Sequence, residues 1–178
     1  MNPVKPLNIV ITGPESTGKT ELAKYLYGKY KSCLVPEYAR EYIEKLTRTY
    51  NYQDVIRIAE KQIRQQEIAA KQNCEIVILD TWLIITKIWF VEVFGKYPSW
   101  MDSKLKEIRI DLYLLCATDI PWIPDPVREN GGERRDYLFT VYLKEIEQLH
   151  VPYYIVTGKG MKRFKLAEDF ITKHFNIK

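Results

Sequence analysis

The stretch Leu7–Thr20, LNIVITGPESTGKT, decides the fold. Its first part, Leu7–Thr12, is a short apolar run rich in β-branched side chains, which predicts a buried strand. Gly13–Thr20 then matches the pattern GxxxxGK[ST], and the spacing of the apolar residues that follow predicts a helix from Lys19 to about Tyr30. A strand, a loop of this pattern and a helix, in that order, are the structural context of a phosphate-binding loop, or P-loop.

Each fixed position of this loop has a chemical reason. Glycines let the backbone wrap closely around a phosphate with its N–H groups pointing inward, and the helix that follows offers its positive end to the anion. Lys19 is placed to reach the β- and γ-phosphates of a nucleotide, and the Thr20 hydroxyl to ligate Mg²⁺. We therefore predict that ATP or GTP phosphates and Mg²⁺ bind to the loop residues, with ATP as the expected nucleotide: Gly13, Pro14, Glu15, Ser16, Thr17, Gly18, Lys19 and Thr20.

Strands and helices alternate along the rest of the chain. Apolar runs predict further strands, and helical periodicity or composition predicts the segments between them. The strands are expected at 32–36, 75–80, 111–116 and 153–156, and the helices at about 38–46, 52–72, 82–94, 101–108, 136–149 and 163–174. Such alternation predicts βαβ units. We expect an α/β protein with the three-layer P-loop NTPase fold, in which a five-stranded parallel sheet has helices on both faces, and one domain over residues 1–178.

Composition narrows the class of protein. A formal net charge of +4 over 178 residues is compatible with anionic substrates, but it forms no basic block of the kind that binds nucleic acid. No window of about 20 apolar residues could span a membrane. We therefore expect a cytoplasmic protein whose partners are ATP and a small molecule. The three cysteines, Cys33, Cys74 and Cys116, are far apart and lie beside apolar residues, which predicts buried, reduced thiols.

Two carboxylates are predicted at strand ends. Asp80 closes the apolar run EIVILD, where an acidic residue can hold the metal opposite the P-loop, although a strand often ends in Asp simply as a turn residue. Glu37, in VPEYAR, ends the second strand, where ligands bind in open α/β sheets. It is a candidate base for an acceptor hydroxyl, or alternatively a helix N-terminal residue stabilised by the dipole. Arg40, one turn on, either orients Glu37, holds the substrate, or is a surface arginine.

Residues 121–137, PWIPDPVRENGGERRDY, are expected to form a lid. Prolines and glycines oppose regular structure there, while Arg128, Arg134 and Arg135 concentrate positive charge. A phosphoryl-transfer enzyme needs charge on the transferred group and exclusion of water. Arg134 and Arg135 are therefore predicted to be catalytic, and the alternative is a solvated basic loop.

Aromatic residues suggest where a flat ring could stack. Tyr38, Trp82 and Trp122 fall at or just after predicted strand ends and are candidates for contact with a heteroaromatic substrate. Trp89 is a further candidate for stacking, but it falls within the segment 82–94, which is apolar nearly all round, so burial in a helix is the favoured expectation. Both histidines lie away from the strand ends and are expected to be structural.

Four motifs, GPESTGKT, VPEYAREYIEK, ILDTW and PWIPDPVR, resemble in order and spacing the ribosylnicotinamide kinase domain of the NadR family. The resemblance covers about residues 7–175. It implies transfer of the ATP γ-phosphoryl group to the ribose 5′-hydroxyl of nicotinamide riboside, giving nicotinamide mononucleotide in NAD salvage. The competing interpretations are a kinase for another nucleoside or small hydroxylic metabolite, and a non-catalytic ATP-binding regulatory module.

The resemblance also implies roles for individual residues. One departure concerns Trp82, which stands where the family can carry a second acidic residue after the Asp-Thr pair. The implied roles are phosphate and Mg²⁺ binding for Lys19 and Thr20, metal support for Asp80, a place near the acceptor for Glu37, Tyr38 and Arg40, and the start of the lid for Trp122, Asp125 and Arg128.

Overall fold

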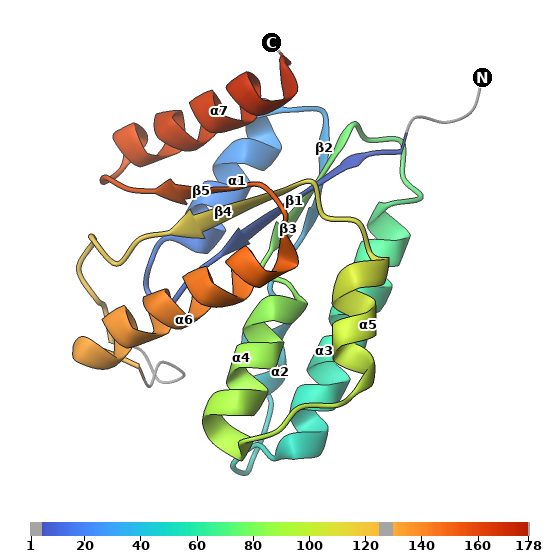
Figure 1. Cartoon of the computed structure of the whole chain (residues 1–178), viewed down its shortest axis with the longest axis vertical. Helices are drawn as coiled ribbons and strands as arrows, with labels where there is room; N and C mark the ends of the chain where they lie inside the picture. The colour runs from blue at the N-terminus through green and yellow to red at the C-terminus, as the bar shows by residue number, and fades with distance from the viewer. Residues whose placement is uncertain (1–4, 125–129, 178) are drawn as a thin grey trace.

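The computed structural model describes residues 5–124 and 130–177. Its strands form one parallel sheet in the order β2-β3-β1-β4-β5, with the strand of the P-loop at the centre (Figure 1). The predicted α/β fold is confirmed. The strands are β1 (Leu7–Thr12), β2 (Ser32–Val35), β3 (Ile76–Asp80), β4 (Leu112–Cys116) and β5 (Tyr153–Val156).

Helices cover both faces of this sheet and complete the three layers. Helices α1 and α7 pack on one face, and α3, α4, α5 and α6 lie on the other (Figure 1). The helices are α1 (Lys19–Lys29), α2 (Tyr38–Glu44), α3 (Tyr52–Ala69), α4 (Leu83–Phe94), α5 (Trp100–Glu107), α6 (Glu133–Leu149) and α7 (Met161–Phe175). None of the helices in the described part of the chain combines the length and the apolar character that a membrane crossing needs.

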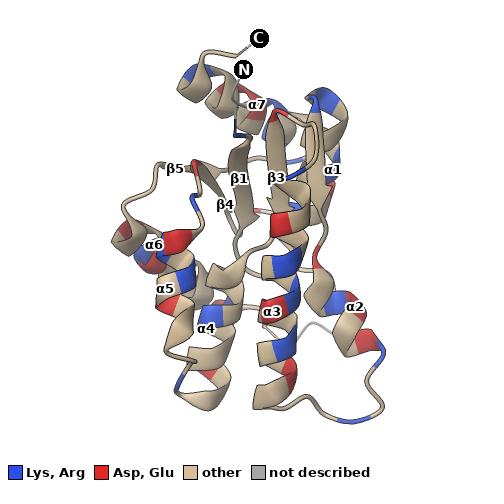
Figure 2. Cartoon of the chain, turned by 90° about the vertical axis from the view of Figure 1, so that its right-hand side faces the viewer, with Lys and Arg blue, Asp and Glu red and all other residues tan. Residues whose placement is uncertain are grey.

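The apolar strand sequences follow from this double cover. Along β1, Ile9 and Ile11 pack into the core beneath α1 and α7, while Val10 packs into the opposite core. Successive side chains of a strand point to opposite faces, so a strand that is covered on both sides is apolar at most positions; in β1 the exceptions are Asn8 and Thr12. The helices are amphipathic instead: in Figure 2, acidic and basic residues are interspersed on the outer side of α3, whose other side is buried.

Helix α6 begins three residues earlier than the sequence predicted, at Glu133 rather than Asp136. Gly132 precedes it with φ 56° and ψ −140°, a conformation that glycine adopts without strain. Acidic residues in the first turn, Glu133 and Asp136, also suit the positive end of the helix. As a consequence, Arg134 and Arg135 lie on a helix with fixed directions and not in an irregular loop.

The prediction of three reduced cysteines was wrong for two of them. Cys33 and Cys74 form a disulfide with a Cα–Cα distance of 5.8 Å, whereas Cys116 is a buried free thiol as expected. The two paired residues are 41 positions apart in the chain. They meet because the segment before β3 runs beside β2, where the Glu75 N–H donates to the Lys31 carbonyl at 2.9 Å. The pairing of these strands belongs to the tertiary structure, and the spacing of cysteines in the sequence does not predict it.

Candidate active site

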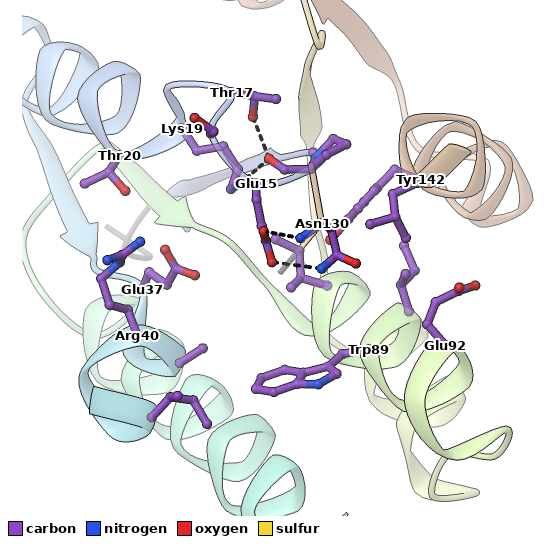
Figure 3. A pocket seen from close by; sticks show the side chains of 18 of the residues that line it. Glu15, Thr17, Lys19, Thr20, Glu37, Arg40, Trp89, Glu92, Asn130 and Tyr142 are labelled. Atoms are coloured by element: carbon purple, nitrogen blue, oxygen red, sulfur yellow. Dashed lines mark hydrogen bonds between the residues drawn. The ribbon is translucent and has the colours of Figure 1, made fainter. Parts of the chain in front are cut away.

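A cavity of about 750 Å³ lies where β1 and β2 end. Its size is that of a typical small-molecule site. The P-loop forms one wall, and Figure 3 shows Glu37 and Arg40 on one side of the cavity and Asn130, Tyr142 and Glu92 on the other. The remaining lining comes from one side of α4 and from the segment Arg48, Thr49 and Tyr50, which precedes α3. Groups from six separate places in the chain therefore share one space.

The P-loop has the backbone that its sequence predicts. Gly13 has φ 131°, and a Cβ atom there would lie 2.7 Å from the carbonyl oxygen of Cys116 on β4, so only glycine fits. Gly18, at φ 73°, is the N-cap of α1. Helix α1 thus begins at the cavity and directs its positive end into it. A phosphate is the natural ligand of this arrangement.

Two side chains of the loop converge on one of its own carbonyls. The Lys19 ammonium donates to the Pro14 carbonyl at 2.7 Å, and the Thr17 hydroxyl donates to the same oxygen at 2.8 Å (Figure 3). The carbonyl oxygen holds the ammonium over the cavity. A phosphate oxygen, being charged, is a stronger acceptor for that ammonium than a neutral carbonyl.

Thr20 and Asp80 form a pair of hard oxygen donors beside the loop. Asp80 is buried at the end of β3, and it accepts a hydrogen bond from the Thr20 hydroxyl. Burial raises the pKa of the Asp80 carboxyl, while Thr20, Lys19 and Lys24 favour the ionised form. Its Oδ1 atom is buried without a hydrogen-bond partner within the described residues. Oxygen donors of this kind, with one atom unsatisfied, fit Mg²⁺.

Glu37 occupies the N-cap position of α2, but its side chain makes no capping hydrogen bond there. The carboxylate instead borders the cavity (Figure 3). Burial is the largest cause of a raised Glu37 pKa, and the charges of Asp80 and Glu15 add to it, while Lys19 and Arg40 oppose it. A carboxylate whose pKa is raised is a better proton acceptor than an ordinary one. Glu37 therefore lies at the helix N-terminus without acting as a side-chain cap.

The acceptor residues predicted from sequence are only partly brought together. Arg40 lines the cavity near Glu37 and forms an ion pair with Glu44 at 3.4 Å. Tyr38 does not line it: its ring packs 5.9 Å from that of Tyr42 and lies below the Lys61 ammonium. The predicted residues Asp125 and Arg128 lie outside the described residues.

The two predicted tryptophan contacts are also not part of the cavity wall. Trp82 is 0% exposed in the core between the sheet and α4, so it cannot stack on a ligand in this structure. The reason is that β3 ends at Asp80 and the chain turns at once into α4, which directs Trp82 inward. Trp122 packs its indole against Gly131, where a Cβ atom would lie 3.2 Å from the ring.

Trp89 was predicted to be buried, and this was wrong: it is partly exposed and lines the cavity from α4 (Figure 3). The ring of Tyr50 meets it edge to face, with centroids 4.9 Å apart and planes at 77°. Ile88 and Tyr142 add further apolar surface to this part of the cavity. The apolar sequence of α4 did not reveal that Trp89 borders the cavity, because a helix side that borders a ligand cavity can be as apolar as one that borders the core.

The lid arginines have different environments. Arg134 lines the cavity, pairs with Glu92 of α4 and lies 4.9 Å from the centre of the Tyr137 ring. Arg135 is 5% exposed and does not line the cavity. Its guanidinium donates at 2.8 Å to the carbonyls of Ile120 and Ser16. The structure therefore separates the two residues that the sequence had grouped as catalytic.

Asn130 is a further residue that sequence reasoning missed. Its backbone N–H and its side-chain amide donate to the two carboxylate oxygens of Glu15 at 3.0 and 2.9 Å (Figure 3). The N–H of Ile123 donates to the Ser16 hydroxyl at 2.9 Å. The P-loop side chains thus hold the described residues on either side of 125–129. No motif signals these contacts, since they depend on where the chain returns to the loop.

A central strand, a P-loop and a helix, with Lys19, Thr20 and Glu37 lining one cavity and Asp80 bonded to Thr20, define a P-loop nucleotide-binding protein of the α/β class. Residues 8–163 match the AAA domain family, and since this range is most of the chain, the protein belongs to that family.

The chain is also similar to characterised proteins, and the resemblance to NadR seen in its motifs is confirmed. It is 25% identical over 94% of its length to the trifunctional NAD biosynthesis/regulator protein NadR of Salmonella typhimurium, of which it spans 44%. A crystal structure of a NadR protein in complex with NR superposes with a TM-score of 0.80 at 23% identity, covering 97% of this chain and 52% of that one. Deoxyadenosine kinase from M. mycoides with bound dCTP has a TM-score of 0.60 at 13% identity, over 94% of this chain and 100% of that one. At these identities the two structures establish the fold.

Proposed function

We propose that the protein is a P-loop phosphotransferase that moves the γ-phosphoryl group of ATP to the 5′-hydroxyl of nicotinamide riboside (NR), giving nicotinamide mononucleotide. The observation that carries this proposal is that Glu37, a carboxylate with a raised pKa, faces the same cavity as Lys19 and the P-loop amides. A protein that only sensed nucleotide would need no proton acceptor at that place. The complex of a NadR protein with NR supports this choice of acceptor.

The phosphate side of the cavity binds the triphosphate. Amide groups of the P-loop and the positive end of α1 surround the phosphates, and Lys19 exchanges the Pro14 carbonyl for phosphate oxygens. Thr20 and Asp80 would hold Mg²⁺, which neutralises phosphate charge when it is bound. Arg134, which already borders the cavity, is proposed to bind the transferred group in place of its pairing with Glu92.

The chemical step uses Glu37. As the 5′-oxygen of the riboside attacks the γ-phosphorus, its proton passes to the Glu37 carboxylate. The bond between the γ-phosphorus and the bridging oxygen of ADP breaks, and ADP leaves with that electron pair. Arg40 lies beside Glu37 in Figure 3 and favours its ionised form, which is the form that accepts the proton.

The acceptor side fits a flat, cationic ring. The pyridinium of nicotinamide riboside carries a positive charge, and aromatic faces attract cations as well as stacking on planar groups. Trp89, whose ring meets that of Tyr50 edge to face, supplies such a surface across the cavity from the P-loop (Figure 3). The described part of the wall thus places an aromatic surface within the same cavity as Glu37.

A panel of nucleosides tests this function. Each nucleoside is incubated with the protein and ATP–Mg²⁺, and ADP release is followed against a blank without acceptor. We expect nicotinamide riboside to give the highest kcat/KM, with a product that carries a 5′-phosphate. A higher kcat/KM for another nucleoside would reassign the acceptor. ADP release that no nucleoside stimulates, together with tight ATP binding, would identify a regulatory module instead.

A further inference from the structure

Two buried arginines, from helices that follow β4 and β5, meet the P-loop at neighbouring residues. Arg135 of α6 donates through Nη2 to the Ser16 carbonyl at 2.8 Å. Arg163 of α7 donates through Nη2 to the Thr17 carbonyl at 3.1 Å. Their exposed fractions are 5% and 2%. A buried guanidinium is uncommon in proteins, and the terminal nitrogens of both donate to backbone carbonyls.

Each guanidinium also holds a second part of the molecule. Arg135 donates through Nη1 to the Ile120 carbonyl at 2.8 Å, in the segment after β4. Arg163 has more partners, which lie after β4 and after β5. They are the carbonyls of Ala117 and Gly158, both at 2.9 Å, and the Asp119 carboxylate at 2.7 Å. The two guanidinium groups, each with two terminal nitrogens that donate to different segments, thus fix the P-loop relative to the segments that follow β4 and β5.

The geometry of the peptide bond gives these contacts a consequence. In a trans peptide the carbonyl and the N–H point in opposite directions, and the described chain has no cis bond. When the Ser16 and Thr17 carbonyls point at the arginines, the N–H groups of Thr17 and Gly18 are turned the other way. Thr17 and Gly18 both line the cavity. Ser16 has φ 56°, a conformation that non-glycine residues keep only when their surroundings enforce it.

We propose that Arg135 and Arg163 are positioning residues of the nucleotide site. They hold two successive carbonyls of the P-loop outward and thereby aim the Thr17 and Gly18 amides at the phosphates. They act through the backbone and do not touch the nucleotide. Their charge contributes to the attraction of an anion, but the orientation depends on the forked shape of the guanidinium, which a lysine lacks. The proposal rests on phosphate binding by the P-loop, and not on the identity of the acceptor.

Binding measurements without acceptor test it. Wild type, Arg135→Lys and Arg163→Lys are titrated calorimetrically with inorganic tripolyphosphate, ATP–Mg²⁺ and adenosine. Since the variants keep the charge and lose the fork, we expect the Kd of tripolyphosphate and of ATP to rise about tenfold or more, as for other residues that orient a binding group. The Kd of adenosine should stay as in wild type. Arg64→Lys, on the exposed surface of α3, is the matched control and should change none of these values.

The outcomes separate the two proposals. Wild type that binds neither ATP nor tripolyphosphate would contradict the proposed function itself. If wild type binds both ligands and the folded variants bind them with unchanged affinity, the positioning role alone is overturned. An equal loss of adenosine and tripolyphosphate binding would also overturn it, because it would indicate general loosening of the site. If circular dichroism shows that Arg163→Lys does not fold, Arg135→Lys, on the first turn of α6, decides the question.

Discussion

The two sides of the cavity are built by different means. On the phosphate side, eight contiguous residues supply backbone amides, a helix end and Lys19, and buried arginines hold the loop from behind. On the opposite side, where we propose that the acceptor binds (the acceptor side), side chains come from α2, from the segment before α3, from α4 and from α6. A site made of backbone groups recognises a charge that many ligands share. A site made of side chains recognises one shape, and its residues can change without changing the fold.

The acceptor wall has a support of its own. Arg48 lines the cavity and donates to both oxygens of Asp54 at 2.6 and 2.9 Å. The Tyr42 hydroxyl donates to the same carboxylate at 2.9 Å, and the Asn51 N–H donates at 2.9 Å. Asp54 therefore joins α2 and the segment that carries Tyr50 to α3. We expect it to support the acceptor side as Arg135 and Arg163 are proposed to support the phosphate side.

The largest effect is expected on the phosphate side. Lys19→Ala removes the charge aimed at the β- and γ-phosphates, and it should abolish nucleotide-dependent turnover while the unfolding midpoint stays near that of wild type. Steady-state ADP release and thermal melts measure the two quantities. Near-wild-type turnover in this variant would contradict the assignment of the P-loop as the nucleotide site.

Glu37→Gln tests the junction between the two sides. It keeps the size of the side chain and removes its basicity, so kcat should fall about 10²-fold or more, while the Kd of ATP changes little. Glu41→Gln, on the same helix and exposed, serves as the control. If kcat of Glu37→Gln survives within a few-fold, Glu37 orients the substrate and the base lies elsewhere.

The same residue predicts a pH dependence. A base acts in its ionised form, so kcat/KM should decrease as pH falls through the Glu37 pKa. Because burial raises that pKa above its ordinary value of 4.5, the acid limb should lie higher than that of an exposed glutamate. Glu37→Gln should lack this limb. A wild-type profile that is flat down to the ordinary range of carboxylates would exclude Glu37 as the base.

Arg134→Ala should have a smaller effect on chemistry. A hydrogen bond to a charged group contributes about 1.5–3 kcal/mol, which corresponds to roughly 10- to 150-fold. Because the Arg134 side chain is partly exposed, we expect kcat to decrease by the low end of this range, roughly tenfold, with a smaller change in the KM of ATP. Steady-state kinetics with both substrates varied separate the two. A change confined to the KM of ATP would show that Arg134 binds the ground state and does not stabilise the transition state.

Trp89→Ala should affect only the acceptor side. Loss of an aromatic stack of about 0.5–1.5 kcal/mol should raise the acceptor KM roughly threefold to tenfold and leave the KM of ATP unchanged. Val91→Ala, on the exposed part of the same helix, is the control and should leave both constants unchanged. A rise in the KM of ATP in Trp89→Ala would place the tryptophan at the nucleotide instead.

The sequence alone determined most of the phosphate side. Gly13, Lys19 and Thr20 lie within eight consecutive residues, and their predicted roles follow from a local backbone shape that a motif encodes. Glu37 and Asp80 also lie near this loop, because β2, β3 and β1 are parallel and end at one edge of the sheet: β3 pairs with β1, and β2 pairs with β3. The catalytic and metal roles of these residues remain predictions.

Only the tertiary structure decided the acceptor side. Trp82 and Trp89 lie on one apolar segment, yet packing against the sheet buries the first and turns the second to the cavity. Arg134 and Arg135 are neighbours, but the direction of α6 sends one to the cavity and the other to the Ser16 carbonyl. Composition and periodicity report which residues avoid water. They do not report whether an apolar or charged side chain meets the core, the backbone or a ligand, because that depends on which distant element lies opposite.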